Sequence, residues 1–318
     1  MSTETSLLLL WLVLIQGGAA IRPVVTFTPD YRKIFISEDI TMVCDVASTI
    51  GEELRYIWYK DSDPVHNGKS YTIQNAETSH RGSYRCETSN GGRSDPVRLD
   101  VSHGDVILQT PLYVYEGDDI TIKCDHRPGS IGDKTRFYKD NRVIRDWGDN
   151  AEYHIGNVNR NTAGTYRCIK GVDFHDTVSS RFKNHEDEVS VSVEDLFETL
   201  IVKVTPHPAI EGDNMTLTCE TSLPPTRHNV ELQISFYREA EILHGYGITY
   251  IYEIHNVQLG HSGKYSCEVE TTNGRVRKRS AEQVIHIEEQ ELTLQSVNPI
   301  SDIGPRRLQN RNLDMASL

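Results

Sequence analysis

The six cysteines of the chain fall into three pairs at similar separations: Cys44 with Cys86, Cys124 with Cys168, and Cys219 with Cys267. The residues before the first cysteine of each pair alternate between apolar and polar, as in Ile120-Thr121-Ile122-Lys123-Cys124. A period of two is typical of a β-strand with one face in a core, and it places the cysteine on the buried face. The sequence therefore predicts three disulfides in three small β-structured units.

A tyrosine lies two residues before the second cysteine of every pair, at Tyr84, Tyr166 and Tyr265. A tyrosine corner followed by an inward cysteine is typical of the immunoglobulin-type sandwich. We therefore expect an all-β chain of three tandem immunoglobulin-like (C2-type) sandwiches, each with one disulfide between its B and F strands. The aromatic residues expected to pack on these disulfides are Trp58, Phe137 and Phe236.

The repeat also divides the chain of 318 residues. We expect a signal peptide over 1–20, domain one over 21–102, domain two over 103–194, domain three over 195–288 and a disordered tail over 289–318. The signal peptide is predicted from the apolar run Leu7–Ile15 and the small residues that follow it up to Ala20. No later apolar run approaches the length of a membrane span, which predicts a secreted chain.

Composition and charge exclude several classes of function. The net charge of −13 argues against a nucleic-acid partner, because such proteins need a basic face. With all six cysteines in disulfides, none is left for a metal site, and the thirteen histidines form no catalytic or metal-binding motif. We therefore expect no enzymatic activity, no cofactor and no metal. Paired cysteines also indicate an oxidising compartment.

The stretch after Cys168 has two interpretations. It contains Phe174, His175, Phe182 and the acidic run Glu186-Asp187-Glu188 before apolar alternation resumes at Val189. It is either a solvated hairpin insertion or a ligand-contacting loop, since loops at sandwich ends often bind ligands.

Domain three contains two further features. The basic cluster after Cys267 is predicted to be a solvated edge that blocks strand pairing, with a heparin-like site as the alternative; its members are Arg275, Arg277, Lys278 and Arg279. Asn214-Met215-Thr216 is the one N-glycosylation sequon of the chain, and we expect Asn214 to be exposed at the start of a strand.

Several short motifs resemble those of leukocyte Fc receptors and Fc receptor-like proteins, nearest to the three-domain high-affinity receptor for immunoglobulin G. The resemblance covers about residues 22 to 287, and its most specific parts are Gly92-Arg93-Ser94-Asp95-Pro96, Val106-Ile107-Leu108-Gln109, Phe137-Tyr138-Lys139-Asp140, Glu194-Asp195-Leu196-Phe197 and Lys278-Arg279-Ser280. It implies an immune receptor, on the cell surface or soluble, that binds immunoglobulin Fc or a related immune protein chiefly through domain two.

The family pattern and this chain differ at the expected contact. Relatives that bind immunoglobulin G clamp a proline between two tryptophans, at positions that Asp105 and Arg127 occupy here. We therefore expect a more polar contact that weakens with salt. Trp147 either faces solvent or caps the core.

The candidate ligand-binding residues are expected to share one end of domain two: Asp125, His126, Arg127, Asp140, Asn141, Arg142, Trp147, Phe174 and His175. The alternative function is an adhesion or growth-factor-binding module with a different ligand, since sandwiches serve many partners.

Overall fold

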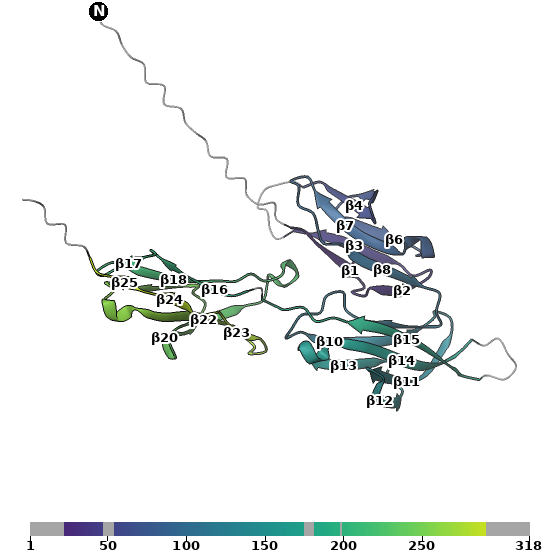
Figure 1. The fold of residues 1–318 in the computed structure, drawn as a ribbon. Coiled ribbons are helices and arrows are strands. Elements are labelled where there is room, and N and C mark those ends of the chain that lie inside the picture. Colours follow the sequence, from purple (N-terminus) through teal and green to yellow (C-terminus); the bar gives the residue numbers. More distant parts are fainter. Residues whose placement is uncertain (1–21, 47–53, 175–180, 198, 291–318) are drawn as a thin grey trace, which may run out of the picture.

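The computed structural model describes residues 22–46, 54–174, 181–197 and 199–290, which form three β-sandwiches (Figure 1). One sheet of the first sandwich has the order β1 (Val24–Thr28), β3 (Ile40–Asp45), β6 (Ser70–Ile73). Its other sheet has the order β2 (Lys33–Phe35), β8 (Val97–Ser102), β7 (Gly82–Thr88), β4 (Tyr56–Lys60), β5 (Asp63–Asn67).

The second sandwich repeats this plan. One sheet has the order β13 (Glu152–Asn157), β10 (Asp119–His126), β9 (Val106–Gln109). The facing sheet has the order β12 (Arg142–Gly148), β11 (Ile131–Lys139), β14 (Gly164–Asp173), β15 (Lys183–Val191).

The third sandwich adds a small parallel pair to the two sheets. One sheet has the order β16 (Ile201–Thr205), β18 (Met215–Glu220), β21 (Ile251–Ile254). The other has the order β20 (Glu241–Gly247), β19 (Leu232–Arg238), β22 (Gly263–Thr271), β23 (Arg277–Arg279), with β24 (Gln283–Ile285) also paired to β22. The parallel pair is β17 (Ala209–Ile210) with β25 (Ile287–Glu288). The all-β fold class is confirmed, while the domain boundaries stay a prediction.

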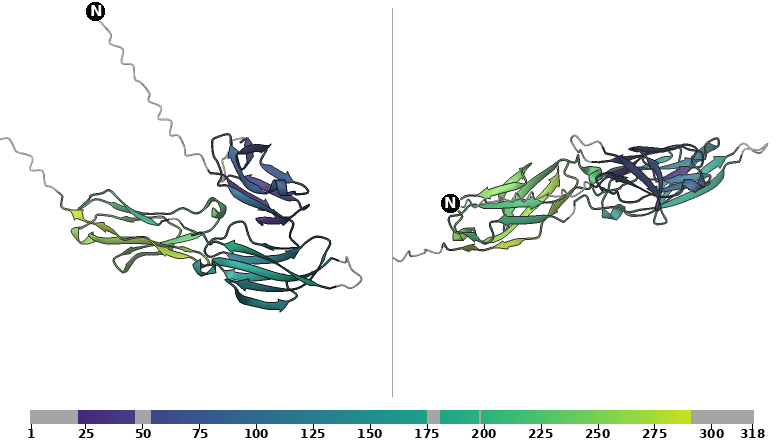
Figure 2. Two further views of the ribbon diagram at one scale, coloured as in Figure 1. Left: turned by 45° about the vertical axis from the view of Figure 1, so that its right-hand side comes forward. Right: turned by 90° about the horizontal axis from the view of Figure 1, so that it is seen from above.

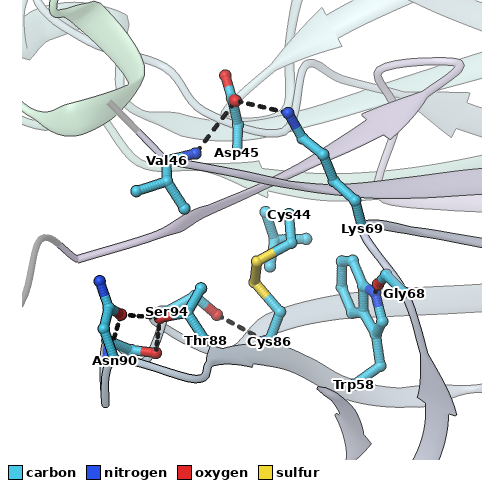
Figure 3. Close-up of a disulfide and its surroundings, with 12 residues drawn as sticks. Cys44, Asp45, Val46, Trp58, Gly68, Lys69, Cys86, Thr88, Asn90 and Ser94 are labelled. Carbon is cyan, nitrogen blue, oxygen red and sulfur yellow. Dashed lines mark hydrogen bonds and ion pairs between the residues drawn. A yellow bond between two sulfur atoms is a disulfide. The ribbon is translucent and has the colours of Figure 1, made fainter. Parts of the chain in front are cut away.

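The three predicted disulfides are present, with sequence separations of 42, 44 and 48 residues. In the first sandwich Trp58 lies beside the Cys44–Cys86 bridge and its indole N–H donates to the Gly68 carbonyl over 2.9 Å (Figure 3). Phe137 and Phe236 take the equivalent buried places in the other two. The expected aromatic core positions are therefore correct.

Beside two of these bridges, a serine hydroxyl takes the place of a backbone carbonyl from a neighbouring strand as the acceptor for the cysteine N–H. The Ser94 hydroxyl accepts the Cys86 backbone N–H at 2.9 Å, and the Ser280 hydroxyl accepts that of Cys267 at 3.0 Å. An unpaired buried N–H is costly, so each serine stabilises the strand that holds the second cysteine. This gives a physical reason for the Arg-Ser pairs that the motif comparison singled out.

Each tyrosine corner closes over a short 3₁₀ turn, and the turns are η1 (Thr78–His80), η2 (Arg160–Thr162) and η4 (Leu259–His261). Tyr84 donates to the His80 carbonyl at 2.7 Å and Tyr166 to that of Thr162 at 2.8 Å. Burial raises the pKa of the Tyr166 phenol to about 12, so it remains a donor at physiological pH. The side chain of the last residue in each turn accepts a hydrogen bond from the backbone N–H of the residue three positions earlier. His80, for example, accepts that of Glu77 at 2.9 Å.

Domain three meets the other two where they join (Figure 2). Leu112 belongs to the core cluster of domain one, although it follows β9 of domain two. Tyr115, three residues later, belongs to the core cluster of domain three. Another 3₁₀ turn, η3 (Pro225–Arg227), approaches the same place, where the Thr226 hydroxyl donates to the Tyr115 hydroxyl over 3.0 Å. One short segment therefore joins all three cores.

The basic cluster of domain three lies on and just before the edge strand β23 and is largely solvated, with Arg275, Arg277 and Arg279 exposed, but two of its members also form ion pairs with domain two. Arg275 lies 3.3 Å from Asp119, and the Lys278 ammonium lies 3.1 Å from carboxylate oxygens of Glu116 and Asp195. Domain three therefore places two of its four clustered cations on carboxylates at its contact with domain two. The sequence pattern could not show that the hairpin after β22 brings this basic cluster against domain two.

A further ion pair strengthens this contact. Arg227 of η3 lies 2.6 Å from the Asp118 carboxylate, and its guanidinium sits over the Tyr115 ring at 4.8 Å. Gly117, with φ of 84°, packs so tightly that an added Cβ would lie 2.4 Å from the Val276 side chain. The Glu116–Asp119 turn is thus shaped for domain three.

The core of domain two contains one lysine. Lys170 is 4% exposed and follows Cys168 on the inward face of β14. Its ammonium donates to the Thr135 hydroxyl at 3.0 Å. Burial lowers the pKa of Lys170 from its ordinary value of 10.5, because it disfavours the charged form.

We expect Lys170→Met to change how the stability of the chain depends on pH. Because the folded-state pKa of Lys170 is lowered, the unfolded chain binds more protons between that pKa and 10.5. The free energy of unfolding of the wild-type chain should therefore rise with pH in that window relative to the methionine variant. Denaturant titrations at several alkaline pH values measure this, with Lys134→Met, an exposed lysine on the neighbouring strand β11, as the control. Parallel pH profiles for wild type and Lys170→Met would contradict the assignment.

Asp118→Asn should loosen the contact between domains two and three. The amide keeps the shape and can still accept the Tyr115 N–H, but it no longer offers a charge to the half-buried Arg227. We expect a loss of about 1–3 kcal/mol at this contact and a broader distribution of interdomain distances by small-angle X-ray scattering. Asp149→Asn, at an exposed position of domain two, should leave the scattering profile unchanged. Identical profiles for both variants would mean that the ion pair does not hold the domains.

Candidate functional site

Four strand ends meet at the end of domain two that faces the hinge. Strand β10 ends there at His126 and β14 at Asp173, while β9 begins at Val106 and β15 at Lys183. The pairing of Val106 with His126, and of Lys183 with Val172, brings these ends together. Strand direction alone therefore places the hinge, the loop after β10 and the β14–β15 hairpin side by side.

An ion pair occupies the two positions at which relatives are expected to have tryptophan. The Arg127 guanidinium lies 3.1 Å from the Asp105 carboxylate. The Arg127 backbone N–H also donates to the Asp105 carbonyl at 2.9 Å, and its guanidinium donates to the His103 carbonyl. These contacts tie the loop after β10 to the hinge, so the two substituted positions are direct neighbours.

The hairpin contributes two more side chains to this group. His185 Nδ1 lies 3.0 Å from the second oxygen of Asp105. The Phe174 ring stands edge-on to the His185 ring, with ring centres 5.9 Å apart, and the Arg127 guanidinium lies 5.9 Å from the Phe174 ring centre. We call Asp105, Arg127, Phe174 and His185 the tip cluster.

The tip cluster is partly exposed, although two of its nitrogen atoms are buried without a hydrogen-bond partner. The exposed fraction of the Arg127 side chain is 42%, and those of Asp105 and His185 are 30% and 26%. Within the part of the chain that the structure describes, Arg127 Nε and His185 Nε2 have no hydrogen-bond partner. An aromatic ring, a guanidinium and an imidazole held in one place are groups that commonly dominate protein interfaces.

Two other candidate residues lie beside the tip cluster but have local partners. Asp125 pairs with Lys123 at 2.7 Å and accepts the His126 backbone N–H at 2.9 Å. His126 packs beside Lys170 across Gly132, where an added Cβ would lie 2.8 Å from His126 Nδ1. Asp125 and His126 therefore stabilise the residues around the tip cluster more than they add to its contact surface.

The prediction that Asp140, Asn141 and Arg142 share this end is wrong. They form the turn after β11, where Asp140 accepts the Thr165 backbone N–H at 2.9 Å, next to the start of β14. Strand β11 runs antiparallel to β14, so its end lies opposite the end of β14. The turn is therefore at the far end of the sandwich from the tip cluster.

Trp147 and His175 complete the predicted set. Trp147 lies on the edge strand β12 and is 40% exposed, so its ring is at the surface and does not cap the core. No contact that the structure records joins it to the tip cluster. His175 lies outside the described residues.

The acidic run was expected to be part of the long excursion, but it lies within β15. Asp187 takes an inward position there, accepts the Leu108 backbone N–H at 2.7 Å and pairs with Lys33 of domain one at 2.7 Å. Glu186 pairs with Arg167 at 2.7 Å on the other face. Alternation that continues backward from Val189 through Asp187 to His185 could have revealed this strand and the involvement of His185.

Metal-binding clusters and membrane-spanning helices are absent from the described ranges. No group of three or more histidine, cysteine, aspartate or glutamate side chains there could hold a metal ion. Among the same residues no helix has the length and apolar character needed to cross a membrane.

Comparison with known proteins identifies the family. The family model described as "Immunoglobulin domain" matches residues 22–101, 106–182 and 199–286. Human Fc receptor-like protein 4 is 29% identical over 277 residues, covering 86% of this chain and 52% of that protein. Mouse Fc receptor-like B is 30% identical over 278 residues, covering 86% of this chain and 63% of that protein.

A solved structure gives a similar match over one domain. The second Ig-C2 domain of human Fc receptor-like A is 27% identical, with a TM-score of 0.25, and covers 29% of this chain and 98% of that one. The chain spans about half the length of the first curated relatives that it matches, between 42% and 52%. The finer resemblance to the high-affinity receptor for immunoglobulin G stays a prediction. The chain belongs to the immunoglobulin-domain family and is a member of its Fc receptor-like group.

Proposed function

We propose that this chain is a non-enzymatic immune receptor-type protein that binds immunoglobulin Fc, or a related immune protein, through the hinge end of domain two. The tip cluster is the proposed centre of the contact. Binding takes place outside the cell in this proposal, because three disulfides need an oxidising compartment. The soluble form stays a prediction from the sequence.

The observation that carries the proposal is the contact between Asp105 and Arg127. These are the positions that the family resemblance assigns to the ligand, and their side chains lie 3.1 Å apart at one end of domain two. Phe174 and His185 join them there, which gives the site an apolar ring among polar groups. Names of the relatives, including a cat low affinity immunoglobulin gamma Fc region receptor that is 28% identical over 52% of this chain, support an immunoglobulin ligand.

The polar character of the tip cluster has a consequence for the strength of binding. In relatives with two tryptophans the contact would bury aromatic surface, whereas here a guanidinium and a carboxylate already satisfy each other. Binding must compete with this internal ion pair, so the affinity should be modest and should fall as salt rises. A ligand that offers its own carboxylate to Arg127 would suit the site.

The direct test is binding of the full chain to immunoglobulins of the same species, each isotype immobilised separately. We expect Arg127→Ala combined with Phe174→Ala to weaken binding by about 2 kcal/mol, because both side chains are lost from the centre of the contact. Surface plasmon resonance at low and high salt measures the affinity and its screening. The matched control is Arg142→Ala, which removes an exposed arginine at the far end of the same domain.

Trp147→Ala distinguishes a ligand contact at the tip cluster from one along β12. If binding survives loss of Arg127 and Phe174 but fails without Trp147, the contact lies along β12 and the proposed tip is wrong. If no isotype is retained by the wild-type chain, the alternative of an adhesion or growth-factor-binding module gains support.

We also propose that Asn214 carries an N-linked glycan. Asn214 is exposed at the turn before β18, where its side-chain oxygen accepts the Asn256 N–H at 3.2 Å. The turn of domain three that contacts Gly117 lies at the opposite end of β22, so a glycan on Asn214 would point away from domain two.

Enzymatic deglycosylation of chain made in secretory cells tests this modification. A fall in mass that Asn214→Gln and Thr216→Ala both abolish is expected, while Thr218→Ala on the same strand should keep it. Affinity for immunoglobulin should not change in Asn214→Gln. An unmodified mass for the wild-type chain would contradict the proposal.

A further inference from the structure

The only carboxylate of the tip cluster, that of Asp105, is shared between two basic side chains. One of its oxygens lies 3.1 Å from Arg127 Nη2, and the other lies 3.0 Å from His185 Nδ1. An ionised carboxylate only accepts hydrogen bonds, so Nδ1 carries the hydrogen of the neutral imidazole. A second proton is then taken up at Nε2. His185 can therefore change its charge and keep its bond with Asp105.

The Arg127 guanidinium is held at one of its two ends. Nη2 makes the contacts with Asp105 and with the His103 carbonyl, and among the described residues the structure shows no partner for Nη1. The side chain is 42% exposed, so a ligand can reach it. A ligand carboxylate that binds Arg127 must compete with Asp105, an acceptor of the same chemistry that is already in place.

The charge on His185 shifts the balance of this competition. With a neutral imidazole, the charges of Asp105 and Arg127 cancel. With an imidazolium, the tip cluster has one net positive charge, and Asp105 is attracted to two cations at once. Histidine is the side chain whose charge ordinarily changes between about pH 5 and 8. A mildly acidic solution should therefore make the tip cluster a better site for an anion.

Other charged groups near His185 act in both directions. They come from the elements packed around it: Lys170 and Asp173 on β14, Lys183 and Asp187 on β15, Asp125 and His126 at the end of β10, and Lys33 on β2. Lys170 lies opposite His185 in the pairing of β14 with β15, and its ammonium opposes a second cation nearby. Asp187 is already paired with Lys33. Asp105, in direct contact with the ring, favours the imidazolium.

We propose that His185 is a positioning residue that controls, through Asp105, how readily Arg127 binds an acidic group of the ligand. Protonation of His185 gives Asp105 a second cation, so Asp105 holds Arg127 less tightly and the carboxylate of the ligand replaces it there. The inference rests on the proposed function, because the ligand must bind at the tip cluster.

Ligand binding and protonation of His185 then favour each other by thermodynamic linkage. The ligand that fits presents an aspartate or glutamate side chain to Arg127, with apolar atoms beside it that contact the Phe174 ring. One coupled proton changes the affinity by at most about tenfold per pH unit. The chain should therefore bind this ligand more tightly in a mildly acidic compartment than in neutral fluid.

Surface plasmon resonance of the full chain on immobilised immunoglobulin Fc, at about pH 7.4 and about pH 5.8, tests the proposal. We expect the wild-type chain to bind about fivefold more tightly at the lower pH. His185→Asn, whose amide can still donate to Asp105 but gains no charge, should lose this difference. His185→Lys, which is charged at both pH values, should bind at neutral pH as tightly as the wild type does in acid. A gain of affinity excludes misfolding as its cause.

His154→Asn is the matched control. His154 Nε2 lies 3.1 Å from Asp119 at the start of β10, the opposite end of this strand from the tip cluster. This variant removes a histidine–aspartate pair from the same domain and should keep the pH dependence of the wild type. Any titration of the Fc itself is common to all the variants.

NMR of the histidine rings in the absence of ligand gives a second readout. The signal of His185 is the one that disappears in His185→Asn. It should titrate at a lower pH in Asp105→Asn than in the wild type, because a neutral amide no longer favours the imidazolium.

The outcomes separate this inference from the proposed function. Equal pH dependence of binding in the wild type and in His185→Asn would overturn the inference and leave the proposed function intact. So would a titration of His185 that Asp105→Asn does not change. A wild-type chain that binds no Fc at either pH would overturn the proposed function and this inference with it.

Discussion

The arrangement of the three sandwiches depends on the segment from Leu112 to Tyr115. Leu112 is buried in the core of domain one and Tyr115 in that of domain three, although both belong to the chain of domain two. Tyr113 lies between them and donates to the Val25 carbonyl at 2.9 Å. Buried side chains cannot leave these cores without exposing apolar surface, so the segment fixes the positions of both outer domains relative to domain two. The ion pairs of Arg227, Arg275 and Lys278 then select the orientation of domain three.

This fixed joint determines which surfaces remain for partners. Lys33 of domain one and Asp187 of β15 hold domains one and two together close to the tip cluster, so the hinge cannot move independently of the hairpin. Asp105 lies within that hinge and shares its carboxylate between Arg127 and His185. The proposed ligand contact is therefore a part of the domain junction.

The sequence alone could predict the parts of the fold that follow from a repeating residue pattern within a short stretch of chain. Alternation before each first cysteine and the tyrosine before each second one predicted the sandwiches, the disulfides and the aromatic core residues, which the structure confirms. Contacts between domains have no period, so the pairing of Lys278 with Glu116 and of Asp187 with Lys33 could not be foreseen. The direction of β11 could have been inferred, and it would have excluded Asp140 from the tip. His185 was missed because a histidine in an acidic stretch resembles a solvated loop.

Hydrogen exchange of the full chain, with and without a bound immunoglobulin Fc, tests the central claim most directly. Backbone amides of the loop after β10 and of the facing ends of β14 and β15 should become protected, because the ligand covers the tip cluster. Amides of the turn after β11 and of β20 should exchange at the same rate in both states. Protection confined to domain one, to domain three or to the far end of domain two would show that the ligand binds elsewhere.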